Sequence, residues 1–184
     1  MQRKVLQSPR QRRIFGSMML NPRNCVAFTG HRTYRNEARE ALSRTLEELY
    51  ARGFRTFLSG MAAGFDLAAA EAVLELRGRH PEVRLVAAVP FPEQAARFPA
   101  ARRRLYEEVL ARADGVELLA PAYHPGCYAR RNDFLVDHAA VVVAWYDGSP
   151  GGTHYTLERA RRHGREIINL CGSRPSESAV PSLF

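Results

Sequence analysis

Residues 139–158 have the sequence AAVVVAWYDGSPGGTHYTLE, in which a continuous apolar run is followed by two glycines and a helical pattern. An apolar run without alternation is typical of a strand buried on both faces of a parallel sheet, so we expect this strand to lie centrally. Adjacent glycines before a helix let backbone N–H groups face outward, where the helix N-terminus attracts anions. The glycines therefore form either a phosphate-binding loop or a simple turn.

Strand-like and helical patterns alternate along the rest of the chain. Apolar runs typical of strands occupy residues 25–29, 54–59, 84–90, 116–119, 140–146 and 166–170. Helical patterns lie between them at 36–52, 66–77, 100–113, 128–138 and 153–163. This alternation predicts an α/β fold with a mainly parallel sheet covered on both faces. Ligands bind such sheets beyond the carboxyl ends of the strands, which makes the strand-to-helix loops the candidate binding segments.

The first predicted helix has a clear apolar face. Its inward positions are Ala38, Leu42, Leu46 and Leu49, and Asn36 is placed to cap its N-terminus.

The positive charge of the chain is concentrated at its beginning. Residues 1–23 hold six of the 27 basic residues and no acidic one, which leaves 21 basic against 19 acidic residues in the remainder. We therefore expect a basic disordered extension at 1–23, a folded domain at 24–171 and a flexible tail at 172–184. Nucleic-acid binding is not expected except through the basic extension, because the folded part is nearly neutral.

The three cysteines show no paired spacing, so neither a disulfide framework nor a metal site is expected. No apolar run reaches the roughly 20 residues of a membrane helix. Serine-nucleophile and P-loop motifs are absent from the sequence. We expect a cytoplasmic protein that requires no cofactor, and a homodimer is compatible with the sequence.

Two of the strand-to-helix loops combine glycines with polar side chains. The loop after the first strand offers the hydroxyl, imidazole and guanidinium groups that suit a phosphate or sugar, in the sequence Thr29, Gly30, His31 and Arg32. The loop after the second strand is Gly-rich, and its polar and glycine positions are Ser59, Gly60, Gly64 and Asp66. Asp66 either caps the next helix or accepts a ribose hydroxyl.

The helix pattern before the central strand begins with two arginines. Arg130 and Arg131 lie in its first turn, where the helix dipole disfavours cations. A bound anion would explain this placement, and Asp133 provides a local alternative. Arg131 precedes Leu135 by four residues and so lies on the inward side, which favours Arg131 as the anion ligand.

Five motifs in this order resemble the YpsA-like branch of the SLOG superfamily: FTGHR, LSGMAAGFDLAAAE, VPFPEQ, YARRNDFLVDHA and GGT. The resemblance spans residues 25–170 and implies a Rossmann-like three-layer sandwich. The superfamily includes the LOG phosphoribohydrolases and the DNA-processing protein DprA. Its YpsA-like branch implies a nucleotide-derived ligand, such as ADP-ribose, an NAD relative or a nucleoside phosphate.

The LOG pattern assigns roles to individual residues. It implies that Arg131 binds and acts on the substrate, that Glu158 is the catalytic carboxylate and that Asn132, Pro150, Gly151, Gly152 and Thr153 belong to the ligand site. One residue is inserted before the conserved Thr position, which turns Glu158 away and suggests a surface pair with Arg162 instead. The leading hypothesis is therefore a nucleotide-binding module, for example a sensor. The alternatives are an N-glycosidic hydrolase acting on nucleoside 5′-monophosphates and single-stranded DNA binding as in DprA.

Overall fold

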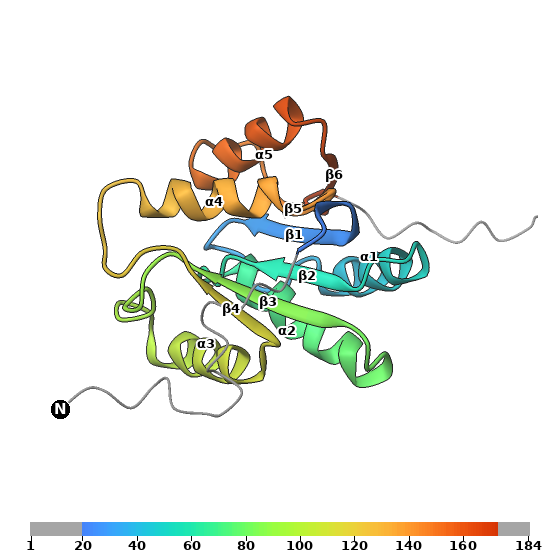
Figure 1. The fold of residues 1–184 in the computed structure, drawn as a ribbon, viewed down its shortest axis with the longest axis horizontal. Helices are drawn as coiled ribbons and strands as arrows, with labels where there is room; N and C mark the ends of the chain where they lie inside the picture. The colour runs from blue at the N-terminus through green and yellow to red at the C-terminus, as the bar shows by residue number, and fades with distance from the viewer. Residues whose placement is uncertain (1–19, 173–184) are drawn as a thin grey trace, which may run out of the picture.

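A single parallel sheet organises the part of the chain that the computed structural model describes, residues 20–172. Its strands are β1 (Cys25–Gly30), β2 (Thr56–Ser59), β3 (Arg84–Val89), β4 (Gly115–Leu118), β5 (Val141–Trp145) and β6 (Glu166–Asn169). They lie in the order β4-β3-β2-β1-β5-β6, and every pair is parallel. Figure 1 shows the sheet between two groups of helices, so the predicted Rossmann-like sandwich is confirmed.

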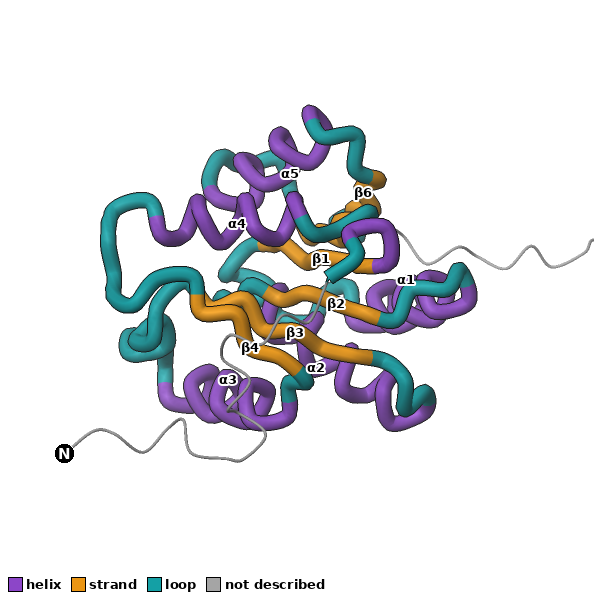
Figure 2. Tube along the Cα trace, in the orientation of Figure 1, coloured by secondary structure: helices purple, strands orange, loops and turns teal. Residues whose placement is uncertain are grey.

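The helices divide between the two faces of the sheet. They are α1 (Arg39–Ala51), α2 (Phe65–Arg79), α3 (Ala100–Arg112), α4 (Cys127–Asp137) and α5 (Gly152–Arg162), and a short 3-10 turn, η1 (Pro22–Asn24), precedes β1. The larger apolar core joins α1, α2 and α3 to one face of the sheet. Two smaller cores join α4 and α5 to the other face, and Figure 2 shows these two helices side by side.

The strand β5 has the burial that its sequence predicts. Val141, Val142, Val143 and Ala144 are all 1 % exposed or less, because alternate side chains enter cores on opposite faces. The strand pairs with β1 on one edge and β6 on the other. It is thus an interior strand, but β2 and β1 occupy the middle of the sheet, which corrects the expectation that this run is central.

The strand order reverses between β1 and β5. The chain winds from β1 to β4 in one direction and then returns to place β5 on the other side of β1. At such a point the loops that leave the two strands diverge and open a crevice. Figure 1 shows the strands ending on the side where the long connection from β4 reaches α4.

The start of α1 differs from the sequence-based prediction. The helix begins at Arg39 rather than at 36, and no side chain caps its N-terminus. Asn36 has a φ of 71°, which places it in a left-handed turn before the helix rather than at the capping position. The predicted inward positions are correct: Ala38, Leu42, Leu46 and Leu49 are each at most 7 % exposed.

The predicted extension and tail fall largely outside the described residues, which exclude 1–19 and 173–184. Within the described range Leu20 packs against the smaller core under α4. No helix between residues 20 and 172 has both the length and the apolar character needed to cross a membrane.

Candidate functional site

A cleft of about 370 Å³ lies at the point where the strand order reverses. Three strand-to-helix loops and the first turns of α4 contribute to it. Its lining residues are Thr29, Gly30, His31, Arg32, Ala62, Asp66, Tyr128, Arg131, Asn132, Gly152 and Thr153. The structure therefore brings together residues from all four segments that the sequence singles out.

Arg131 is the buried cation of this cleft. It is 6 % exposed, its Nε donates to Asn132 Oδ1 at 2.7 Å and its Nη1 donates to the Gly60 carbonyl at 2.5 Å. No hydrogen bond joins its Nη2 to any residue in the described range. Arg130, the preceding residue of α4, is exposed, as expected for a position that points away from the sheet. The guanidinium of Arg131 is thus held in place with one nitrogen left for a ligand.

Asp66 is the buried anion beside it. A Cβ on Gly60 would lie 2.7 Å from Arg131 Nη1 and 2.8 Å from Asp66 Oδ2, so the two charged groups flank this glycine closely. Burial raises the pKa of Asp66 to about 6, and this effect exceeds the opposing attraction of Arg131 and the hydrogen bonds from the Ala62 and Gly30 backbones. Burial likewise lowers the pKa of Arg131, and Asp66 opposes that shift.

Three helices begin at this cleft. The lining residues Asp66 and Gly152 lie in the first turns of α2 and α5, and Tyr128 and Arg131 lie in the first and second turns of α4. No side chain caps any of these three helix N-termini. At the start of α2 the Phe65 and Leu67 N–H groups already donate to the His31 and Ala62 carbonyls, so the partial positive charge left for a ligand is chiefly that of the α4 and α5 N-termini. Together with Arg32 and Arg131, they make the cleft attractive to an anion.

His31 connects the loop after β1 to the loop after β5. Its Nε2 lies 2.8 Å from Asp147 Oδ1 and 3.3 Å from the Asp147 backbone nitrogen. The shorter distance favours a proton on Nε2 that is donated to the carboxylate. The ring also packs edge-on against Trp145. His31 lines the cleft and at the same time fixes the relative position of two of its walls.

The glycines of the first two loops serve packing more than ligand access. A Cβ on Gly30 would approach Phe65 Cβ to 2.4 Å, and one on Gly64, which has a φ of 96°, would approach the His31 carbonyl to 2.4 Å. The space that a Cβ on Gly60 would need is likewise taken by the side chains of Arg131 and Asp66. Gly30 and Gly60 thus leave room for Phe65, Arg131 and Asp66, and Gly30 also lines the cleft. Gly152 differs, because a Cβ there would meet only Asn132 Nδ2, at 3.6 Å.

Several predicted site residues do not line the cleft. Ser59 is fully buried, where its Oγ accepts from the Met61 backbone and donates to the Asp66 carbonyl. Pro150 and Gly151 are exposed beyond the lining residues. Asp66 does not cap α2, since its N-cap is Gly64, and the carboxyl belongs to the cleft instead.

Glu158 lies on α5 outside the cleft lining. Its side chain is 47 % exposed and forms an ion pair with Arg161, not with Arg162 as the sequence suggests. The spacing of three residues puts Glu158 and Arg161 on one side of the helix. Asp66 is the sole carboxylate among the described residues that line the cleft.

Sequence reasoning missed two lining residues, Tyr128 and Ala62. The Tyr128 ring lies 5.8 Å from the Arg32 guanidinium carbon and 6.0 Å from that of Arg131. Tyr128 opens the same motif that contains Arg131, so its position one turn before that arginine was the available signal. Within residues 20–172 no group of three or more His, Cys, Asp and Glu side chains could hold a metal ion.

A doubly wound parallel sheet with a cationic cleft at its switch point defines a Rossmann-like α/β protein. The family model YpsA, described as the YspA SLOG family, matches residues 25–168. The chain therefore belongs to the YpsA branch of the SLOG family.

Sequence relatives support the same assignment. The SPbeta prophage-derived protein YoqJ of Bacillus subtilis is 31 % identical over 137 residues, which cover 67 % of this chain and 80 % of YoqJ. A UPF0398 protein of Halalkalibacterium halodurans is 30 % identical over 131 residues, which cover 70 % of this chain and 69 % of that protein.

Solved structures share the fold. DNA processing protein A (DprA) from Streptococcus pneumoniae matches with a TM-score of 0.60 at 22 % identity, over 85 % of this chain and 52 % of that one. DprA from Helicobacter pylori, described in its single-stranded DNA binding mode, matches with a TM-score of 0.61 at 19 % identity, over 84 % of this chain and 68 % of that one. The chain thus spans about half of the pneumococcal protein, and at these identities the likeness concerns the fold.

Proposed function

We propose that the protein binds a nucleotide-derived ligand, with a phosphate in the cleft between Arg131 and the start of α5. The observation that carries this proposal is the buried Arg131, whose Nη2 has no partner among the described residues, beside three uncapped helix N-termini. A buried cation is costly unless it is paired. Asp66 offsets the charge of one of the two arginines that line the cleft, and a phosphate supplies further negative charge and an acceptor oxygen for Arg131 Nη2.

Asp66 gives the ligand a second contact. Its carboxyl lies beside Arg131 at the foot of α2, where it can accept a hydrogen bond from a ribose hydroxyl in the Rossmann manner. The ligand class is accordingly a ribose phosphate with a base, as in a nucleoside phosphate or ADP-ribose. The function is cytoplasmic ligand binding or sensing.

Binding is favoured over hydrolysis of the glycosidic bond. A hydrolase needs a carboxylate that reaches water at the anomeric carbon. Glu158, the carboxylate that a LOG-like hydrolase would use, is engaged with Arg161 outside the cleft lining, which leaves Asp66 beside Arg131 as the sole carboxylate among the described residues that line the cleft. Release of free adenine from AMP by the purified protein would reverse this conclusion.

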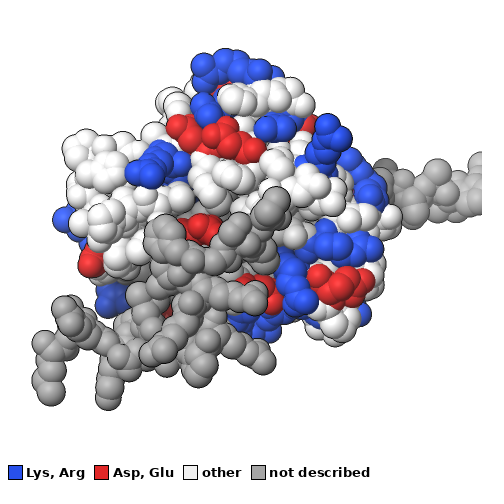
Figure 3. Space-filling model, viewed as in Figure 1, with Lys and Arg blue, Asp and Glu red and all other residues white. Residues whose placement is uncertain are grey.

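Single-stranded DNA binding has less support. It requires a continuous basic groove lined with stacking aromatics. On the face shown in Figure 3, the basic and acidic side chains of the described residues are interspersed. An oligothymidylate that binds more tightly than any mononucleotide would favour this alternative.

Calorimetric titration with AMP and ADP-ribose tests the proposal. Arg131→Ala should weaken both ligands by about 30-fold, the equivalent of about 2 kcal/mol for a charge-assisted hydrogen bond. Arg130→Ala is the matched control, because Arg130 is exposed on the same turn, and it should bind like the wild type.

A second variant covers the case in which Arg131→Ala fails to fold. Gly152→Val adds a side chain at the start of α5, where a Cβ meets no atom closer than 3.6 Å. It should remain folded and should lose phosphate binding through steric exclusion. Normal binding by both folded variants would show that the loop is only a turn.

A further inference from the structure

A second hollow adjoins the cleft. This basin has a volume of about 670 Å³, and it shares Arg32, Ala62 and Tyr128 with the cleft. Its other walls come from the loop that follows β3 and from the connection between β4 and α4. Because the two hollows share lining residues, one ligand can occupy both.

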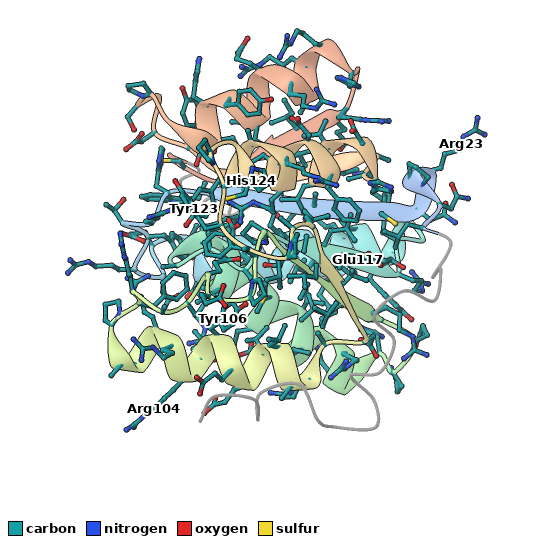
Figure 4. All side chains as sticks on the ribbon, turned by 60° about the vertical axis from the view of Figure 1, so that its left-hand side comes forward. Arg23, Arg104, Tyr106, Glu117, Tyr123 and His124 are labelled. Carbon is teal, nitrogen blue, oxygen red and sulfur yellow. The ribbon has the colours of Figure 1, made fainter. Side chains whose placement is uncertain are left out.

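Three aromatic rings form one wall of the basin. The Phe91 ring centroid lies 5.4 Å from that of Tyr123 and 5.6 Å from that of Tyr128, and the two tyrosine rings are 6.4 Å apart. Phe91 is buried, whereas Tyr123 is 62 % exposed and Tyr128 is 36 % exposed. In Figure 4 Tyr123 lies with His124 on the connection that leads to the start of α4. The rings are inclined to one another by 59–78°, so a planar ligand can stack on the face of one exposed tyrosine while the other ring meets its edge.

Gln94 connects the basin to the cleft through hydrogen bonds to the loop that follows β2. It lines the basin, and its Nε2 donates to the Met61 carbonyl at 2.7 Å and to the Gly60 carbonyl at 3.3 Å. The Gly60 carbonyl is also the acceptor for Arg131 Nη1. Gln94 is 5 % exposed, and its Oε1 has no donor within residues 20–172. Gln94 Oε1 is thus a buried hydrogen-bond acceptor in the basin wall that has no donor within residues 20–172. The edge of a nucleobase carries N–H groups, which are donors of the kind that this oxygen accepts.

We propose that the basin is a nucleobase subsite, in which the base of the ligand packs on Tyr123 and Tyr128 while its phosphate occupies the cleft. This inference rests on the proposed nucleotide binding and narrows it: the ligand class is nucleotides, and sugar phosphates without a base bind poorly. The shared residues Arg32 and Tyr128 lie where the ribose joins the two parts. The sequence VPFPEQ at residues 89–94, which supplies Phe91 and Gln94, then serves the base rather than the phosphate.

Paired titrations test the subsite. AMP, GMP and ribose 5-phosphate are compared by calorimetry on the wild type and on Tyr123→Ala, which alters an exposed side chain. The wild type should bind at least one of the two nucleotides more than tenfold tighter than ribose 5-phosphate. Tyr123→Ala should weaken that nucleotide by about tenfold, as expected for the loss of one stacking ring, and should leave ribose 5-phosphate unchanged. Tyr155→Ala is the matched control, because Tyr155 is 38 % exposed on α5 and lines neither hollow.

The outcomes separate this proposal from the one on which it rests. If the three compounds bind the wild type equally and Arg131→Ala weakens all of them, phosphate binding stands and the base subsite is wrong. An equal loss for nucleotide and sugar phosphate in Tyr123→Ala would also overturn the subsite. If none of the three binds the wild type, both proposals fail together, and tight binding of oligothymidylate in that case would assign the basin to single-stranded DNA.

Discussion

The buried carboxyl of Asp66 predicts an unusual dependence of stability on pH. Its pKa rises from 3.8 to about 6 because burial disfavours the charged form more strongly than Arg131 and Arg32 favour it. The folded state therefore holds this proton more tightly than the unfolded state does. The resulting stabilisation is complete below about pH 3.8 and is lost as the pH rises through about 6. A shift of about two units corresponds to about 3 kcal/mol, of which about 2 kcal/mol falls between pH 4.5 and 7.5.

The substitution Asp66→Asn isolates this contribution. Asparagine has nearly the same size and does not ionise, and the loss of the charge beside Arg131 adds an offset that does not vary with pH in this range. The free energy of unfolding is measured by urea denaturation, followed by circular dichroism, at intervals from pH 4.5 to 7.5. The wild type minus variant difference should fall by about 2 kcal/mol across that interval.

Asp147→Asn provides the control. The pKa of Asp147 is lowered, first by the Ser149 hydroxyl and then by the Ser149 backbone, so this group stays ionised above pH 4.5. The comparison is made in a His31→Gln background, because His31 Nε2 lies 2.8 Å from Asp147 Oδ1 and histidine side chains change charge in this pH range. In that background the difference curve for Asp147→Asn should be flat over the same interval. A flat curve for Asp66→Asn as well would show that the attraction of Arg131 keeps Asp66 ionised, and the account of the buried pair would be wrong.

Four further results are expected. In thermal melts, AMP at a hundredfold excess over its dissociation constant should raise the melting temperature by about 5–10 °C, from about 2.7 kcal/mol of mass action, and adenosine should not. The binding losses of Gly152→Val and Arg131→Ala should be less than additive in calorimetry, because both act on one phosphate; full additivity would place them at separate sites. Gly30→Ala should lower the free energy of unfolding in urea by about 1–3 kcal/mol, since its Cβ would overlap Phe65, whereas Gly152→Ala should change it little. Glu158→Gln should leave AMP affinity unchanged, and a large loss would return Glu158 to the site.

The sequence was sufficient for the order and type of the main elements. The run at Val141–Trp145 lacks alternation because both faces of β5 are covered, so its burial could be inferred locally. The apolar face of α1 was equally legible from spacing, since the helical period alone places Leu42, Leu46 and Leu49 on one side. The residue at which α1 begins could not be read from the sequence. Asparagine suits both a helix cap and a left-handed turn, and the structure has the left-handed turn at Asn36.

The residues of the site also fall into those that the sequence predicts and those whose role depends on the tertiary structure. Residue chemistry and position after a strand were enough to select Arg32, Asp66, Arg131 and Gly152, since the carboxyl ends of parallel strands meet at one edge. Two features depended on packing between segments far apart in the chain: Gly30 and Gly60 make room for Phe65, Arg131 and Asp66, and Gln94 bonds to the loop after β2. The pairing of Glu158 with Arg161 is local, but spacings of three and four residues both suit an ion pair on a helix, so the sequence did not decide between Arg161 and Arg162. Local sequence determines which groups a loop can offer, because backbone period and residue chemistry are local properties. Which of those groups face a common space, and with what pKa, is decided by the neighbours that burial brings to them, and only the tertiary structure supplies those neighbours.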